Sequence, residues 1–203
     1  MMNAAKDNLE LKKYTIHEIP TLVCFKGNDD QKPLVIFSHA FTGAKEDLTD
    51  HLKTFAELGY YAVALDNRAH GERSVRGFIS QRVFDDGKLN VYEVRKLIKE
   101  TADDMQMLIN HFVKEEGVDE GRIGIIGVSM GGFSALRTLV MEERIKVAAS
   151  VIASPYFDEI PEDVPIVKEP EIMRKLKDYS NRYSPASYLD RFYPRAVLFQ
   201  IGG

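Results

Sequence analysis

Hydrophobic and polar positions follow two periods along the chain, one typical of strands and the other of helices. Short apolar runs rich in β-branched residues predict strands over residues 11–16, 21–25, 34–38, 61–66, 123–128 and 147–153. Apolar residues recurring at every third or fourth position predict helices over 45–58, 91–116 and 132–142. The first strands are separated only by Pro20 and a turn, which favours antiparallel pairing. We therefore predict an α/β fold: a mostly parallel central sheet with helices on both faces and antiparallel N-terminal strands.

Two longer stretches interrupt the alternation of strands and helices. Residues 67–90 are rich in Arg, Gly and Asp, and residues 154–183 carry four prolines among aromatic and apolar residues. Both follow the C-terminal end of a predicted strand, the side on which open α/β sheets bind ligands. We expect them to form walls of a pocket, and residues 154–184 are a candidate small lid on a single domain spanning 1–203. Simple packing on the surface is the alternative.

Composition excludes several classes of partner. The net charge of −4 comes from interspersed charges of both signs, without the basic stripe that a nucleic-acid interface needs. No apolar run approaches the ~20 residues that cross a bilayer, and the N-terminus lacks a signal-peptide pattern, so we expect a cytoplasmic protein that binds neither nucleic acid nor membrane. The single cysteine, Cys24, lies in an apolar run and is expected to be buried filler. We expect no cofactor and no metal.

The segment 127–131, Gly-Val-Ser-Met-Gly, carries the clearest chemical signal. It lies between a predicted strand and a predicted helix, with Ser129 at the turn. A serine hydroxyl is a weak nucleophile, and one held clear of the backbone can meet both a base and a substrate carbonyl. The small residues Gly127 and Gly131 allow so tight a turn.

In this setting the chain resembles the α/β-hydrolase superfamily, nearest to small bacterial serine esterases related to the dienelactone-hydrolase and prolyl-oligopeptidase branches. Two further segments match in order. Residues 37–43, Phe-Ser-His-Ala-Phe-Thr-Gly, resemble the family's His-Gly-X segment, with Ala40 where glycine is usual. Residues 66–71, Asp-Asn-Arg-Ala-His-Gly, resemble its Asp-x-Arg-Gly-His-Gly turn, with Ala69 where glycine is expected.

The resemblance implies a serine hydrolase that cleaves a small carboxylic ester. Ser129 would form an acyl-enzyme, and the backbone N–H groups of Met130 and Phe41 would form the oxyanion hole. Two alternatives stay open: a thioesterase or peptidase of the same superfamily, and a non-catalytic binding or scaffold protein on a hydrolase fold.

Other polar residues of the matched segments receive structural interpretations. His39 and His70 are expected to brace loops rather than act as the base, and Asp66 is expected to accept hydrogen bonds from the turn that follows it. The arginines of residues 67–90 are interpreted as a solvated mixed-charge surface rather than as an anion site; they are Arg68, Arg73, Arg76 and Arg82.

In the family, the acid follows the seventh strand and the histidine follows the eighth. Residues 196–203 correspond to the seventh strand and the first residues of its loop, so both groups are expected beyond Gly203. On this interpretation these 203 residues lack the C-terminal strand and helix of the fold and would turn over substrate very weakly. Either the sequence is a portion of a longer hydrolase, or another chain completes the sheet, for example in a homo-oligomer formed through the exposed edge.

Overall fold

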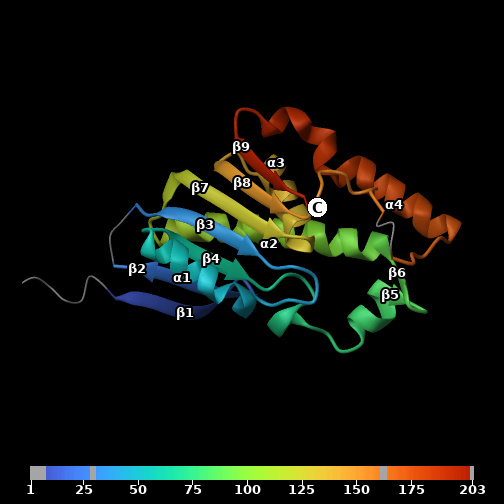
Figure 1. Cartoon of the computed structure of the whole chain (residues 1–203), viewed down its shortest axis with the longest axis horizontal. Coiled ribbons are helices and arrows are strands. Elements are labelled where there is room, and N and C mark those ends of the chain that lie inside the picture. The colour runs from blue at the N-terminus through green and yellow to red at the C-terminus, as the bar shows by residue number, and fades with distance from the viewer. Residues whose placement is uncertain (1–7, 28–30, 161–163, 202–203) are drawn as a thin grey trace, which may run out of the picture.

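The computed structural model describes residues 8–27, 31–160 and 164–201. Within them, seven strands form one sheet in the order β1-β2-β4-β3-β7-β8-β9 (Figure 1). The strands are β1 (Leu9–Ile16), β2 (Ile19–Lys26), β3 (Pro33–Ser38), β4 (Tyr61–Leu65), β7 (Asp119–Val128), β8 (Ile145–Val151) and β9 (Ala196–Gln200). β1 pairs antiparallel with β2, and β2 with β4, whereas all later neighbours are parallel. The predicted fold class and its antiparallel start are confirmed.

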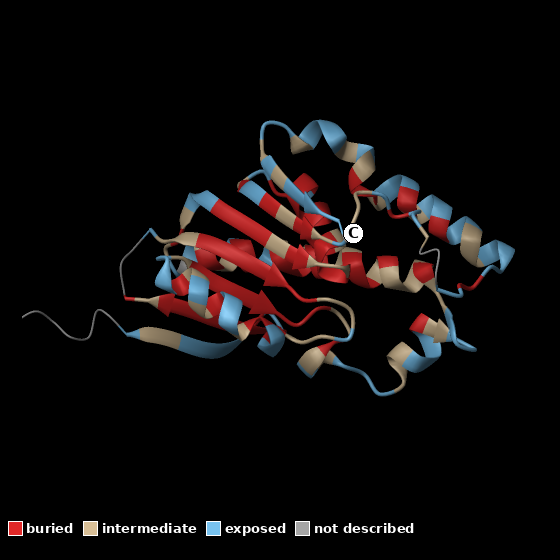
Figure 2. Ribbon diagram, in the orientation of Figure 1, coloured by how far each residue is buried: buried red, intermediate tan, exposed pale blue. Residues whose placement is uncertain are grey.

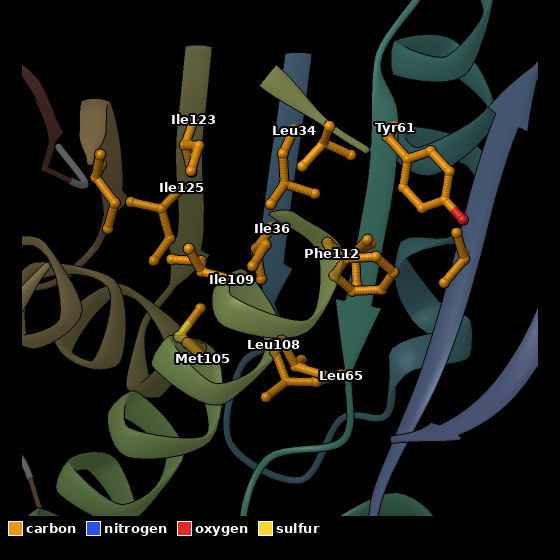
Figure 3. Packing of buried hydrophobic residues seen from close by; sticks show 14 of the residues in the cluster. Leu34, Ile36, Tyr61, Leu65, Met105, Leu108, Ile109, Phe112, Ile123 and Ile125 are labelled. Atoms are coloured by element: carbon orange, nitrogen blue, oxygen red, sulfur yellow. The ribbon is translucent and has the colours of Figure 1, made fainter. Parts of the chain in front are cut away.

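Side chains alternate between the two faces of the sheet, and each face meets different helices. In β3, Leu34 and Ile36 belong to the hydrophobic cluster that includes residues of α2 (Val91–Glu115) and α3 (Met130–Met141). Val35 and Phe37 belong instead to the cluster formed with α1 (Thr49–Glu57). Figure 3 shows the α2 side of this core, and Figure 2 shows that the central strands are its most buried part. No helix of the described ranges is both long and apolar enough to cross a bilayer.

Two helix starts differ from the prediction. The helix expected over 45–58 is a 3₁₀ turn, Lys45–Leu48, followed by α1. The helix expected over 132–142 begins earlier, at Met130, and includes Gly131 and Gly132. Glycine disfavours helix by about 1 kcal/mol, so propensity argues against an earlier start that adds Gly131 to Gly132. Tertiary packing requires glycine there, as described below, and outweighs this preference.

A further helix, α4 (Pro170–Tyr183), lies inside the stretch that was predicted only as an insertion. Its sequence is strongly charged, but Met173, Leu176, Tyr179 and Tyr183 recur at helical spacing, and Leu176 and Ser180 are its buried residues. Leu176 packs against Val91 of α2 and Ile166, which supplies the helix with a small core of its own.

Both insertions lie where the parallel strands end (Figure 1). Residues 67–90 contain a π-helical turn, Ile79–Val83, and a two-stranded hairpin of β5 (Phe84–Asp85) and β6 (Lys88–Leu89). Leu89 pairs with the other insertion: its N–H donates to the carbonyl of Pro165, and its carbonyl accepts from the N–H of Val167, at 2.7 and 3.0 Å. The two segments therefore support each other at this end of the sheet.

Candidate active site

Ser129 lies at the turn between β7 and α3 with φ 52° and ψ −117°. A non-glycine residue with this backbone conformation is strained by about 1–3 kcal/mol and persists only where its surroundings enforce it. The N–H of Ser129 donates to the carbonyl of Val151 at 2.7 Å, and its carbonyl accepts from the N–H of Phe133 at 3.1 Å. Both ends of the turn are thus held by the sheet and by the first turn of α3.

The glycines around Ser129 are required by close backbone contacts. A Cβ at Gly127 would overlap with the carbonyl of Gly131, and a Cβ at Gly131 would overlap with the carbonyl of Ser38 at the end of β3. A Cβ at Gly132 would lie 2.8 Å from that of Ala153. The start of α3 is therefore packed directly onto the sheet, and only glycine fits at these points.

A cleft of about 700 Å³ brings together the three predicted site residues, Ser129, Met130 and Phe41. Phe41 and Met130 also pack in one hydrophobic cluster. Both insertions contribute to the walls of the cleft, as predicted, through Phe84, Leu89, Glu159 and Ile160 among others. That residues 154–184 move as a lid stays a prediction.

Free donors surround the serine. Met130 is the first residue of α3, where an N–H has no acceptor within its helix. In the described parts of the chain, the N–H of Phe41 and the hydroxyl of Ser129 also form no hydrogen bond. Ser129, Met130 and Phe41 thus line one cleft, and among the described residues the hydroxyl of the first and the N–H groups of the other two have no hydrogen-bond partner.

His39 holds the loop that carries Phe41. The N–H of Asn67 donates to Nε2 of His39 at 3.1 Å, and Nδ1 of His39 lies 2.7 Å from the carbonyl oxygen of Ala40. Because the first group can only donate and the second only accept, the ring is neutral with its proton on Nδ1. Burial lowers the pKa of His39, which favours this neutral form. Alanine at position 40 is compatible with a braced loop, since its carbonyl also accepts from the N–H of Gly43 at 3.1 Å.

His70 lies between that loop and the turn after β4. Its Nδ1 is 2.8 Å from the carbonyl oxygen of Arg68, and its ring contacts that of Phe41 at 5.2 Å between centroids. Nε2 is buried without a hydrogen-bond partner, and burial lowers the pKa of the imidazole. In the described residues neither His39 nor His70 lines the cleft, so both lie in bracing positions.

Asp66 accepts hydrogen bonds from the turn that follows it, as expected. Its carboxylate receives the N–H of Glu72 at 3.0 Å, together with the N–H and the ammonium of Lys45 at 2.9 and 2.7 Å. Burial lowers the pKa of Lys45, but its hydrogen bonds to Asp66 and Glu72 outweigh burial and raise the pKa above its ordinary value. This buried pair joins the turn after β4 to the start of the α1 segment.

The interpretation of residues 67–90 as a solvated charged surface is wrong for two of the arginines. Arg68 and Arg73 both bind the buried carboxylate of Asp104 on α2, at 2.5 and 2.6 Å. Asp104 falls on the buried side of α2, far along the chain, and sequence spacing gives no sign of this pairing. The pair ties the first insertion to the helical layer.

Arg95 on α2 is a cleft residue that the sequence reasoning missed. It is 5% exposed, and its Nε and Nη2 donate to the carbonyls of Phe157 and Glu159 at 2.8 and 2.9 Å. A signal was present: Arg95 is four residues after Val91 and three before Ile98, on the apolar face of its helix. A cation on such a face is either paired or functional.

Metal ligands do not gather in the part of the chain that the structure describes: no group of three or more His, Cys, Asp or Glu side chains is placed to hold an ion there.

Comparison with known proteins decides the family. A family model described as "Serine aminopeptidase, S33" matches residues 29–197. The chain belongs to this family, within the α/β-hydrolase superfamily. It is 32% identical over 211 residues to "Putative esterase YitV" of Bacillus subtilis (strain 168), covering 96% of this chain and 77% of that protein. "Esterase YjfP" of Escherichia coli (strain K12) is 21% identical over 204 residues, covering 96% of this chain and 78% of the relative. The crystal structure of TT1662 from Thermus thermophilus matches with a TM-score of 0.67 at 17% identity, over 97% of this chain and 90% of that one.

The strain at Ser129 in this hydrolase is measurable. Glycine adopts a positive φ without penalty, whereas alanine retains the strain. We expect Ser129→Gly to exceed Ser129→Ala in free energy of unfolding by roughly 1 kcal/mol, even after the larger entropy loss of glycine is subtracted. Urea unfolding of the two variants side by side measures the difference. Equal stabilities would show that the turn stores no strain.

The buried imidazoles predict a pH dependence of stability. The pKa values of His39 and His70 lie below the ordinary value of 6.5, so the unfolded chain binds protons first as the pH falls. Their contribution to stability is complete above about pH 6.5 and is lost as the pH falls through the folded-state pKa values. We expect the urea midpoint to fall between pH 7 and pH 5, and less steeply in His70→Gln. His51→Gln, an exposed histidine, is the control and should keep the wild-type slope.

Proposed function

We propose that the protein is a serine hydrolase of small carboxylic esters, with Ser129 as the nucleophile. One observation carries the proposal: a strained serine at a strand-to-helix turn presents an unbonded hydroxyl to a ligand-sized cleft. A packing role alone needs neither the strained backbone nor the opening. This favours catalysis over the alternative of a non-catalytic scaffold.

The chemistry follows from this geometry. Ser129 Oγ attacks the ester carbonyl, and a bond forms between Oγ and the carbonyl carbon while the bond to the alcohol oxygen breaks. The serine proton passes through a general base to the departing alcohol. Water then attacks the acyl-enzyme, releases the acid and restores the hydroxyl. In the described part of the chain, His39 and His70 do not line the cleft, and we assign the base to neither of them.

The carbonyl oxygen becomes an oxyanion during both steps, and we assign its stabilisation to the N–H groups of Met130 and Phe41. Both residues line the cleft beside Ser129, and neither N–H is engaged elsewhere in the described structure. The brace formed by His39 and Asn67 holds the Phe41 loop ready, so no reorganisation is needed when charge develops.

Support for esters over peptides comes from the relatives and from the cleft. Both relatives described above carry the word esterase in their names. The cleft walls are mainly apolar and include Phe84, Leu89 and Ile160, which suits a compact acyl or alcohol group. Thioesters and peptides are the alternative substrates, and we expect the protein to hydrolyse both more slowly than esters of the same acyl group.

Ser129→Ala tests the nucleophile. Loss of Oγ should abolish hydrolysis of p-nitrophenyl acetate and labelling by a fluorophosphonate probe, both scored relative to the wild type, because no other group forms the covalent bond. Ser187→Ala, an exposed serine away from the cleft, is the matched control and should label normally. Labelling that persists in Ser129→Ala would remove Ser129 from the mechanism.

Phe41→Pro and Phe41→Leu together test the oxyanion donor. Proline deletes the backbone N–H, whereas leucine keeps it and changes only the side chain. We expect Phe41→Pro to lower kcat by about 10² to 10³, the usual loss for one oxyanion donor, and Phe41→Leu to lower it by less than about tenfold. Circular dichroism verifies that both variants fold. Equal losses in the two variants would assign the effect to the side chain.

A further inference from the structure

Arg95 is a buried cation in the same cleft as Ser129. Its side chain projects from α2 and is 5% exposed, and it lines the cleft wall. Within the described ranges no carboxylate lies within ion-pair distance of its guanidinium. A buried cation without a counter-ion is costly, so an anionic ligand that reached it would relieve that cost.

Only one of the two hydrogen-bonding edges of the Arg95 guanidinium has protein acceptors among the described residues. A guanidinium has five N–H donors. The edge formed by Nε and Nη2 donates to the carbonyls of Phe157 and Glu159. The opposite edge, formed by Nη1 and the second N–H of Nη2, has no protein acceptor among the described residues. Nη1 is not fully enclosed by protein, and Arg95 lines the cleft. We therefore infer that the accessible part of the side chain faces the cleft. Two parallel donors at this edge match the two oxygens of a carboxylate.

Aromatic contacts fix the plane of the guanidinium. Its central carbon lies 4.1 Å from the ring centroid of Phe133 and 5.5 Å from that of Phe157. Phe133 is one helical turn after Ser129 on α3, and its N–H donates to the carbonyl of Ser129. The cation is therefore held in the cleft that Ser129 also lines, in an orientation that a ligand does not have to impose.

The electrostatic environment of Arg95 also indicates that its positive charge is only partly compensated. Burial lowers the pKa of Arg95 to about 10, and the carboxylates of Glu159 and Asp158 offset burial only in part. Glu159 also lines the cleft, but it is exposed and binds the hydroxyl of Ser154. The hydrogen bonds to the carbonyls of residues 157 and 159 account for one edge of the Arg95 guanidinium. They give no role to the opposite edge.

We propose that Arg95 is the specificity-determining residue of the cleft and selects esters that carry a free carboxylate on the acyl side. The preference for such esters rests on the proposed function, because Ser129 fixes the position of the scissile bond. Binding of a carboxylate at Arg95 does not depend on turnover. The acid would be short, since Arg95 and Ser129 share a cleft of about 700 Å³ and are linked through one aromatic ring.

A matched pair of substrates tests the selection. Mono-p-nitrophenyl glutarate and p-nitrophenyl pentanoate have the same acyl length and differ in the terminal carboxylate. We expect the wild type to favour the glutarate ester in kcat/KM by about 10- to 100-fold, as charge-assisted hydrogen bonds from a fixed guanidinium imply. A wild type that favours the neutral ester would overturn the proposal.

Variants of Arg95 assign the preference. In Arg95→Gln the ratio of kcat/KM for the two esters should fall to about one. Arg95→Lys keeps the positive charge but loses the two parallel donors, so its ratio should lie between that of Arg95→Gln and that of the wild type. Arg174→Gln is the control, because it removes one positive charge from the exposed face of α4 and should leave the ratio at the wild-type value. A ratio that survives in Arg95→Gln would assign selection to another group.

A second variant keeps the test valid if Arg95→Gln does not fold. Glu159→Gln removes the competing carboxylate from the cleft without touching Arg95. It should lower KM for the glutarate ester several-fold and raise the ratio above the wild-type value. A ratio that is unchanged or lower in Glu159→Gln would count against an anion site at Arg95.

Binding separates this inference from the proposed function. Calorimetric titration of Ser129→Ala with glutarate measures the site without chemistry. Glutarate binding that is weaker in the Ser129→Ala/Arg95→Lys double variant than in Ser129→Ala supports the carboxylate site, even if fluorophosphonate labelling disproves Ser129 as nucleophile. Absence of glutarate binding, or tighter binding of inorganic phosphate than of glutarate, would overturn the carboxylate assignment.

Discussion

The first turn of α3 lies in direct backbone contact with the end of β3, and the site depends on this contact. Gly131 faces the carbonyl of Ser38 and Gly127 faces the carbonyl of Gly131, with no room for a side chain at either point. The helix therefore begins at the sheet surface, and the residue between strand and helix is forced into a left-handed conformation. Ser129 occupies that residue, so the same packing that strains the backbone also lifts its hydroxyl into the cleft.

Buried polar groups hold the loops around this turn, and almost all of their bonds run between segments that are far apart in sequence. His39, Asn67 and Ser38 form one network, and Lys45 with Asp66 forms another. Each of these bonds replaces hydration lost on folding, which a partly satisfied network would not do. The loops after β3 and β4 are thereby fixed relative to each other, and Phe41 takes its position from them.

The walls of the cleft come from the two insertions rather than from the sheet. They pair with each other through Leu89 and are tied to α2 by Asp104 and by Arg95. Helix α2 therefore contributes to the hydrophobic core against the sheet and also anchors the cleft. A charge carried on its buried face, as at Arg95, is positioned as rigidly as the core around it.

Much of this protein was determined by local sequence pattern. Strand and helix periods predicted the sheet, its antiparallel start and the helices on both faces, because each element buries one face and repeats its apolar residues accordingly. Gly-Val-Ser-Met-Gly predicted the turn at Ser129, since glycine is required wherever backbones touch. Only the tertiary structure decided the helix start at Met130, the pairing of Asp104 with Arg68 and Arg73, and the carbonyl partners of Arg95. These depend on contacts between residues distant in sequence, whose free energies outweigh local propensity and leave little trace in spacing along the chain.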